Sequence, residues 1–196
     1  PATPLFPWRH EDQDRFERLL QHHVEDRLFP CVGAKAALAK GTLNVLACNR
    51  IDSGWDDLRI HDGLLRFASA YREEPALFRS FAVVFNGPED LDEPAFEQAL
   101  WDRVQSLSDK DVWRGQEYDH RVSHDPEDPH FSLSFGGEAF FVVGLPPQAS
   151  RPARRFAKPA LVFNLHDQFE ILRAEGERDE PGDNRDRPGS QGHGLR

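Results

Sequence analysis

His166 is the first residue whose type and position suit chemistry. It stands where the β-forming run ALVFN meets the helix-forming run LHDQFEILR, with Asp167 beside it and Glu170 one helical turn further on. A histidine whose second ring nitrogen is held by a carboxylate is typical of a metal or haem ligand. The plainer alternative is a histidine at a helix start that hydrogen-bonds a loop, and the residues alone favour it.

Arg151, Arg154 and Arg155 form a basic cluster in a chain that is acidic overall. If this segment is a short helix beginning at Ser150, the i, i+3 and i+4 spacing places the three guanidinium groups on one face. Such a face suits an anion such as a carboxylate, a phosphate or a haem propionate. A solvated face that pairs with acidic side chains is the alternative, and the residues leave both open.

Cys31 and a histidine-rich segment are weaker candidates. Cys31 precedes a predicted helix start, where a thiol can act as a nucleophile or thiolate ligand, although a buried structural cysteine is favoured. A polar, proline-interrupted segment also contains residue types that bind divalent metals: Asp119, His120, His124, Asp125 and His130. Zinc sites have tighter ligand spacing, so we expect a loop without a metal there. No phosphate-binding loop, dinucleotide fingerprint or serine elbow occurs.

Helical and β-forming segments are mixed along the chain that positions these residues. Apolar residues at three- and four-residue steps predict helices, and apolar runs bounded by turn residues predict strands. The expected helices span about 11–27, 33–40, 56–71, 94–107 and 165–174, and the expected strands 42–48, 80–86 and 160–164. Ser53 or Asp56 is expected to cap the third helix, whose buried face includes Leu58 and His61.

The clearest local signal is a hairpin. The runs FSLSF and EAFFVVGL flank Gly136-Gly137, a pair that favours a tight turn between antiparallel strands. We therefore predict an α+β fold: a single domain with a mainly antiparallel sheet, a central β-hairpin and about five packed helices. Residues 1–29 are expected to form an N-terminal arm and amphipathic helix, 30–176 the α+β domain, and 177–196 a disordered tail.

Composition restricts the classes of protein further. The 196 residues include 34 acidic and 24 basic ones, giving a net charge of −10, so nucleic acid is not an expected partner. No apolar run approaches the ~18 residues of a membrane span, and no secretory signal pattern occurs, so no membrane partner is expected. Two cysteines cannot form a disulfide framework. These features predict a cytoplasmic protein with reduced thiols.

Several long strings of the chain resemble the YqcI/YcgG family of bacterial proteins. They occur in the family's order and run from about Phe29 to Gly176: FPCVGAKAAL, SFAVVF, FEQALW, FSLSFGGEAFFVVGL, ASRPARRF and ALVFNLHDQFEILR. Some members of this family are haem-dependent N-hydroxylases of guanidino groups, in guanitoxin and D-cycloserine biosynthesis. The resemblance therefore implies a haem b protein that uses O₂ and an electron donor to N-hydroxylate a guanidino or amino group of an arginine-like small molecule.

The resemblance also implies roles for particular residues. His166, in the family's Phe-Asn-x-His-x-Gln-Phe motif, becomes the leading axial ligand of the haem iron, with Cys31 a weaker alternative. The basic cluster is expected to pair with the propionates, and three hairpin phenylalanines are expected to line the haem face. These residues are Arg151, Arg154, Arg155, Phe135, Phe140 and Phe141.

Three departures from the family's pattern favour a second interpretation. Pro146 stands where the family usually has the histidine of Gly-Leu-His-Pro, and Ser108 stands where it tends to have another histidine. The family's ordered, arginine-rich segment after Gly176 is reduced here to faint echoes. The alternative to an enzyme is therefore a degenerate member that binds haem or another ligand without turnover.

Overall fold

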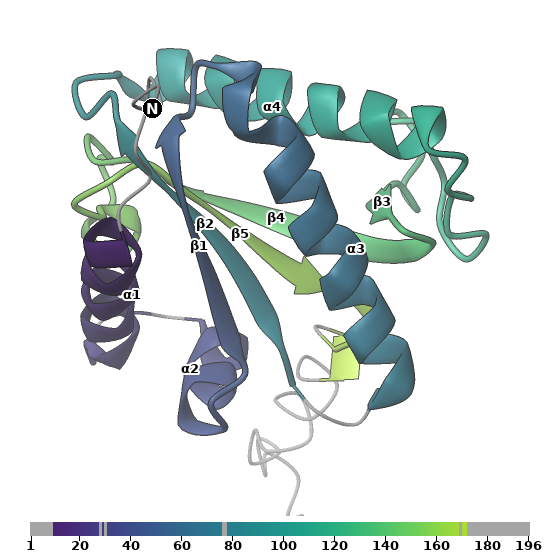
Figure 1. Ribbon diagram of the computed structural model, residues 1–196, viewed down its shortest axis with the longest axis horizontal. Helices are drawn as coiled ribbons and strands as arrows, with labels where there is room; N and C mark the ends of the chain where they lie inside the picture. The colour runs from purple at the N-terminus through teal and green to yellow at the C-terminus, as the bar shows by residue number, and fades with distance from the viewer. Residues whose placement is uncertain (1–9, 28, 30, 76–77, 169, 172–196) are drawn as a thin grey trace, which may run out of the picture.

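Five strands form one open sheet in the order β1-β2-β5-β4-β3 in the computed structural model (Figure 1), which describes residues 10–27, 29, 31–75, 78–168 and 170–171. The strands are β1 (Leu43–Arg50), β2 (Ser80–Gly87), β3 (Leu133–Phe135), β4 (Glu138–Leu145) and β5 (Ala160–Leu165). β1 and β2 are parallel, and the other three pairs are antiparallel. The predicted α+β fold with a mainly antiparallel sheet is confirmed.

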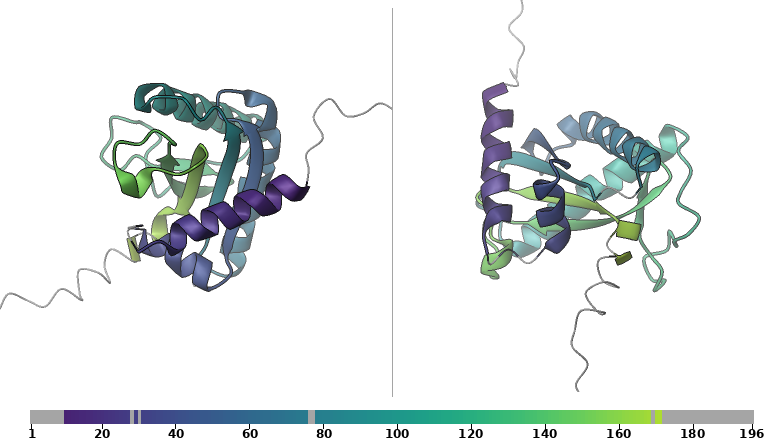
Figure 2. Two further views of the ribbon diagram at one scale, coloured as in Figure 1. Left: turned by 90° about the vertical axis from the view of Figure 1, so that its left-hand side faces the viewer. Right: turned by 90° about the horizontal axis from the view of Figure 1, so that it is seen from below.

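Helices cover both faces of the sheet. They are α1 (His10–Glu25), α2 (Val32–Ala39), α3 (Asp57–Glu73) and α4 (Glu93–Trp113), with short 3-10 helices η1 (Gly54–Asp56) and η2 (Pro152–Arg154). α1 and α2 lie against one face, and α3 and α4 lie against the other (Figure 2). In the part of the chain that the structure describes, no helix is both long and apolar enough to cross a membrane.

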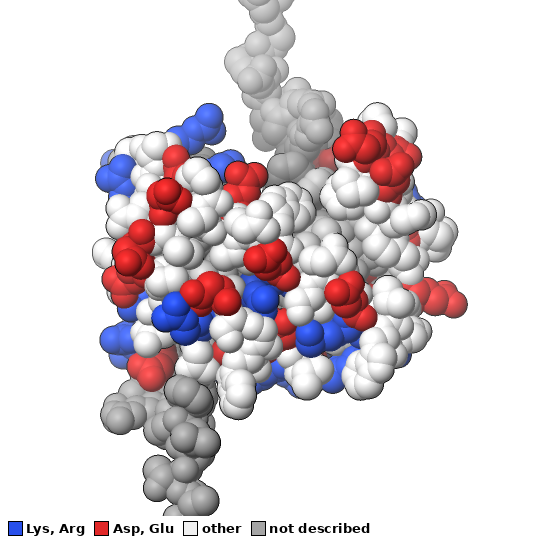
Figure 3. Space-filling model, turned by 90° about the horizontal axis from the view of Figure 1, so that it is seen from above, with Lys and Arg blue, Asp and Glu red and all other residues white. Residues whose placement is uncertain are grey.

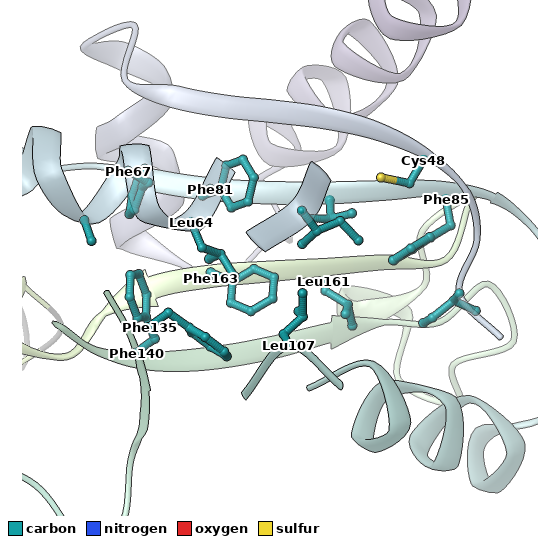
Figure 4. Packing of buried hydrophobic residues seen from close by; sticks show 14 of the residues in the cluster. Cys48, Leu64, Phe67, Phe81, Phe85, Leu107, Phe135, Phe140, Leu161 and Phe163 are labelled. Carbon is teal, nitrogen blue, oxygen red and sulfur yellow. The ribbon is translucent and has the colours of Figure 1, made fainter. Parts of the chain in front are cut away.

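Phenylalanine rings fill the core between the sheet and the α3–α4 layer. Phe135 and Phe140 of the hairpin pack against Phe163 of β5, with ring centroids of Phe135 5.9 and 6.0 Å from those of the other two (Figure 4). All three side chains are essentially fully buried. Burial of three such rings stabilises the fold by several kcal/mol, at about 1.5–3 kcal/mol for each large apolar side chain.

The predicted hairpin is present, but it forms one edge of the sheet rather than its centre because β5 inserts between β2 and β4. Gly136 and Gly137 have φ angles of 58° and 81°, a conformation that side chains with a Cβ rarely adopt and that suits a two-residue turn. The backbone N–H of Gly136 donates to the buried carboxylate of Asp111, which also lies 2.7 Å from Nε2 of the fully buried His61. Side chains of α3 and α4 therefore fix the position of the turn.

Two local expectations for α3 are wrong. Leu58 is 51% exposed, because it lies in the first turn of the helix, off the face formed by Ile60, His61 and Leu64. Ser53 caps η1 by accepting from Trp55 N, and Asp56, at the N-cap of α3, makes no side-chain cap there because its carboxylate accepts from Asn49. The expected arm at 1–9 and the expected disordered tail at 177–196 lie outside the described residues.

Candidate functional site

His166 lies at the end of β5, where the chain leaves the sheet and turns into a helix. Its imidazole stacks on the ring of Phe141 in the neighbouring strand, with centroids 4.6 Å apart and planes 24° apart. Nδ1 lies 4.0 Å from Oδ1 of Asp167, which is too long for a hydrogen bond. No hydrogen bond joins either ring nitrogen to another described residue, so a ring nitrogen is available to a ligand.

A cavity of about 380 Å³ lies on the α1–α2 face of the sheet, where Phe141 and Leu165, the stacking partner and the chain neighbour of His166, are among its walls; His166 itself is not among the described residues that line it. We name it the Cys31 cavity, and its walls include Cys31, Phe78, Arg79, Phe141 and Val143. Cys31 is the N-cap of α2, and its sulfur accepts from Ala34 N at 3.4 Å. The structure thus brings the two sequence-predicted iron-ligand candidates, His166 and Cys31, to the same side of β4.

Arg79 is a feature of this cavity that the sequence did not reveal. Its Nη2 pairs with Glu74 at 2.6 Å, and its backbone N–H donates to Gln168. Its Nε, however, is buried without a hydrogen-bond partner among the described residues. A buried donor without a partner is unfavourable by about 1–3 kcal/mol. Arg79 also lines a cavity on the α3 side of the sheet, with Phe67 and Phe81, so both cavities border this residue.

A cluster of carboxylates that includes Asp167, the chain neighbour of His166, binds the guanidinium of Arg121. Arg121 donates to Asp119, to Glu138 at 3.0 Å and to Asp167 at 2.5 Å. The hydroxyl of Tyr71 also donates to Asp167, at 3.2 Å. The sequence analysis missed this cluster, because its members are distant in the chain; the Asp-x-Arg spacing at 119–121 was its one local signal.

Burial and this cluster shift the pKa of two acids in opposite directions. Burial raises the pKa of Asp119, but hydrogen bonds from Arg121 and from Ala139 N outweigh burial and hold the pKa below its ordinary value. Burial, the charge of Asp167 and the hydrogen bond to it raise the pKa of Tyr71 to about 12. At neutral pH Asp119 is therefore ionised and Tyr71 is a neutral donor that holds Asp167 in place.

A second, larger cavity of about 550 Å³ lies on the α4 side of β4, and we name it the Arg154 cavity. Phe140 and Phe141 of β4, Trp101 of α4, Pro146 and Arg154 are among its walls. No histidine, cysteine or tyrosine is among the described residues that line it. Pro146 therefore lines a cavity to which no described residue contributes an imidazole.

The predicted helical face of the three arginines is wrong. Only Pro152–Arg154 is helical, as a single 3-10 turn, and Arg151 and Arg155 on either side have extended backbones. Pro152 disfavours helical backbone at the residue before it, Arg151, so the turn begins only at Pro152. Arg155 Nε donates to Ala149 O, which directs it away from its neighbours, and only Arg154 lines a cavity.

The structure separates the ligand candidate from the arginines. Arg151, Arg154 and Arg155 precede β5 and His166 follows it, so the length of the strand, about 17 Å at about 3.3 Å per residue, lies between them. Phe141 borders both cavities and Phe140 the Arg154 cavity, whereas Phe135 lies in the core and borders neither.

The histidine-rich segment forms the loop that the sequence analysis expected. Asp119 is buried and bound to Arg121, whereas the side chain of His130 is 85% exposed. Within the described ranges, no group of three or more metal-ligating side chains is close enough to hold an ion. On the face that α4 covers, basic and acidic side chains are interleaved rather than segregated (Figure 3).

Taken together, these features define an α+β protein with an open sheet, a buried aromatic core and a cavity on each side of strand β4. The chain belongs to the YqcI/YcgG family, whose model matches residues 16–184. A search of curated proteins found no match. A search of solved structures found none either.

Proposed function

We propose that this protein is a haem-dependent monooxygenase that N-hydroxylates a guanidino group of an arginine-like small molecule. The sequence strings shared with the YqcI/YcgG family support the reaction class. The geometry that carries the proposal is the position of His166: its imidazole stacks on Phe141 beside an apolar cavity, with no hydrogen bond to a described residue. In this proposal, His166 is the axial ligand of the iron.

The residues around the Cys31 cavity suit a haem. The imidazole of His166, stacked on the wall residue Phe141, would supply the usual protein ligand of haem iron, and Phe141 and Val143 would supply apolar walls. Arg79 offers a buried Nε without a described partner, which a propionate oxygen would satisfy. The volume of about 380 Å³ lies within the range of about 300–1,000 Å³ that ligand pockets occupy.

This placement changes the expected propionate anchor. Arg151, Arg154 and Arg155 lie at the far end of β5 from His166, so they are poorly placed for a haem that His166 ligates. Arg79 lines the cavity that His166 adjoins, and we propose it as the anchor instead. Cys31 lines the same cavity and is the second-choice ligand.

When bound, haem supplies the activation of O₂ and the transfer of one oxygen atom to the substrate nitrogen, with electrons from an external donor. The protein has to bind and orient the cationic guanidino group. The carboxylate of Asp167 is adjacent to His166 in the chain and already binds one guanidinium, that of Arg121. Charge-assisted bonds of this kind are the ones that hold a guanidinium most strongly.

The direct test is a turnover assay on the hemin-reconstituted protein with L-arginine, O₂ and a chemical reductant, with products read by mass spectrometry. The proposal predicts a product heavier than arginine by one oxygen atom, whose label comes from ¹⁸O₂ rather than from water. Haem binding without any such product, from arginine or from simpler guanidines, would reject the enzymatic part of the proposal.

A second candidate function is favoured by Pro146. The larger Arg154 cavity has an aromatic wall and a cation but no imidazole, as expected of a member that has lost the family's usual histidine. A protein that binds haem or another ligand without turnover fits this observation. It predicts a haem spectrum, or binding of another ligand, in the absence of oxygenated product.

A further inference from the structure

The two edges of the sheet differ in whether their outward backbone groups have hydrogen-bond partners, and this difference bears on how the chain assembles. At the β1 edge, side chains bond to the outward backbone groups. Gln13 of α1 donates to Val45 O at 2.7 Å and accepts from Ala47 N at 2.9 Å. Further along, Asp56 accepts from Asn49 N at 2.8 Å. This edge is therefore closed to another strand, as soluble sheet proteins usually arrange.

The opposite edge is open where β3 ends. β3 pairs with β4 only as far as Leu133 opposite Phe140, whereas β4 continues to Leu145 along β5. The two-residue turn makes Glu138 and Phe140 direct their backbone groups toward β3. By the same alternation, Val142 and Gly144 direct their N–H and C=O groups outward.

No described residue pairs with these four outward groups. Val142 and Gly144 both line the Arg154 cavity, together with Phe131 and Ser132 ahead of β3, so this cavity borders the open stretch of the edge. From Ala139 to Leu145 the strand contains no charge and no proline, the devices that usually protect an edge. Val143 is 36% exposed, and Trp101 on the rim of the cavity is 48% exposed.

We propose that this edge binds a second copy of the chain, with the two β4 strands antiparallel about a twofold axis at Val143. In this register, Val142 of one copy lies opposite Gly144 of the other, and each pair exchanges two hydrogen bonds. The four outward groups of each copy are then all paired. The interface is isologous, and the two sheets become one.

Charge supports a second copy as the occupant. Arg154 lines the cavity near Pro146, and within the described residues it makes no ion pair. At the other end of the cavity, Phe131 follows a turn that contains Asp125, Glu127 and Asp128; Asp125 and Glu127 are exposed, and the Asp128 carboxylate accepts from His130 N. The twofold axis between antiparallel strands places the Arg154 end of one cavity opposite the Phe131 end of the other. Arg154 of each copy therefore faces the Asp128–Phe131 turn of the other copy.

The test uses the full chain and the residue on the axis. Because Val143 faces its own copy, Val143→Lys and Val143→Asp each place like charges opposite one another, whereas a mixture of the two variants places opposite charges there. Sedimentation velocity over about a hundredfold range of concentration measures the association. Val143→Thr, which keeps the branched shape, is the matched control.

We expect wild type and Val143→Thr to approach twice the chain mass of 22.4 kDa as concentration rises. Each charged variant alone should associate at least about tenfold more weakly, and their mixture should recover the dimer. Hydrogen exchange should show the amides of Val142 and Gly144 protected only in the dimer. A wild type that stays monomeric overturns the proposal, as do charged variants that dimerise like wild type. An acetylated peptide of residues 140–145 probes the edge independently. If this peptide binds to a wild type that does not self-associate, the edge is open to a strand of another protein and the dimer proposal is overturned.

Discussion

His166 and Phe141 form a stacked pair across neighbouring strands, with ring centroids 4.6 Å apart. Phe141 is opposite Asn164 in the β4–β5 register, so His166, two residues further on, lies diagonally across from it on the same side. The stack fixes the imidazole plane without using its nitrogens. The imidazole is therefore held in one orientation while its nitrogens stay free of hydrogen bonds to described residues. A ligand of haem iron needs both properties.

Replacement of His166 by alanine should abolish the Soret band of the hemin-reconstituted protein. The side chain is 27% exposed and belongs to neither core cluster, so far-ultraviolet circular dichroism should be unchanged. His130→Ala is the matched control, since that side chain is 85% exposed in the loop. A Soret maximum that is the same in His166→Ala and wild type would exclude His166 as the ligand.

Removing the charge of Arg79 or of Arg154 distinguishes which arginine anchors the propionates. Arg79→Gln should weaken hemin retention by about 10- to 100-fold, because a charge-assisted bond to a propionate contributes roughly 1.5–3 kcal/mol, while the band keeps its position. Arg154→Gln should leave retention close to that of wild type. The measurement is the rate of hemin transfer to an excess of an apo-haem acceptor. The reverse ranking would place the haem in the Arg154 cavity.

The buried carboxylate of Asp111 should be a main determinant of stability. Asp111→Ala removes the acceptor of Gly136 N–H and the partner of His61 Nε2, leaving two buried polar groups unsatisfied. We expect a loss of about 2–4 kcal/mol in the free energy of unfolding. Asp109→Ala, which removes an exposed partner of Gln105, should change it by less than about 0.5 kcal/mol. Equal effects in urea titrations would contradict this assignment.

Asp119 should contribute to acid sensitivity. Because its pKa is lower in the folded protein than the ordinary 3.8, its contribution to stability is complete above that value and is lost as the pH falls through the folded pKa. Asp119→Asn should cost about 2 kcal/mol at neutral pH, less than a fully buried pair because Arg121 is 45% exposed. The variant should also lose less stability than wild type between neutral pH and pH about 3. Parallel stability–pH curves would count against this role.

Much of the fold follows from local sequence signals. The periodicity of 11–27 and 94–107 and the apolar run at 80–86 correspond to α1, α4 and β2, because each segment buries one face or a whole strand against the sheet. The Gly136-Gly137 pair predicted both the hairpin and its two-residue turn, and the structure contains them. The position of the hairpin at the edge was not predictable in this way, since it depends on β5 returning between β2 and β4.

The site was less accessible to sequence reasoning. Cys31, Phe141 and His166 were singled out by residue type, but their common location depends on the packing of α2 and β4, far apart in the chain. The Arg121 cluster joins partners up to 46 residues away, and Arg79 stands out only by its buried, unpaired Nε. The helical spacing of Arg151, Arg154 and Arg155 gave a wrong prediction, because Pro152 holds Arg151 in extended backbone and the helical turn ends at Arg154.

The central claim is that this chain holds a haem through His166. An absorption titration of the purified, full-length protein with hemin tests it most directly, with His166→Ala titrated in parallel. The account predicts a sharp Soret band in wild type that saturates at one hemin per chain, and no such band in the variant. A wild-type protein that stays colourless apart from free hemin, or a variant that saturates like wild type, would contradict the account.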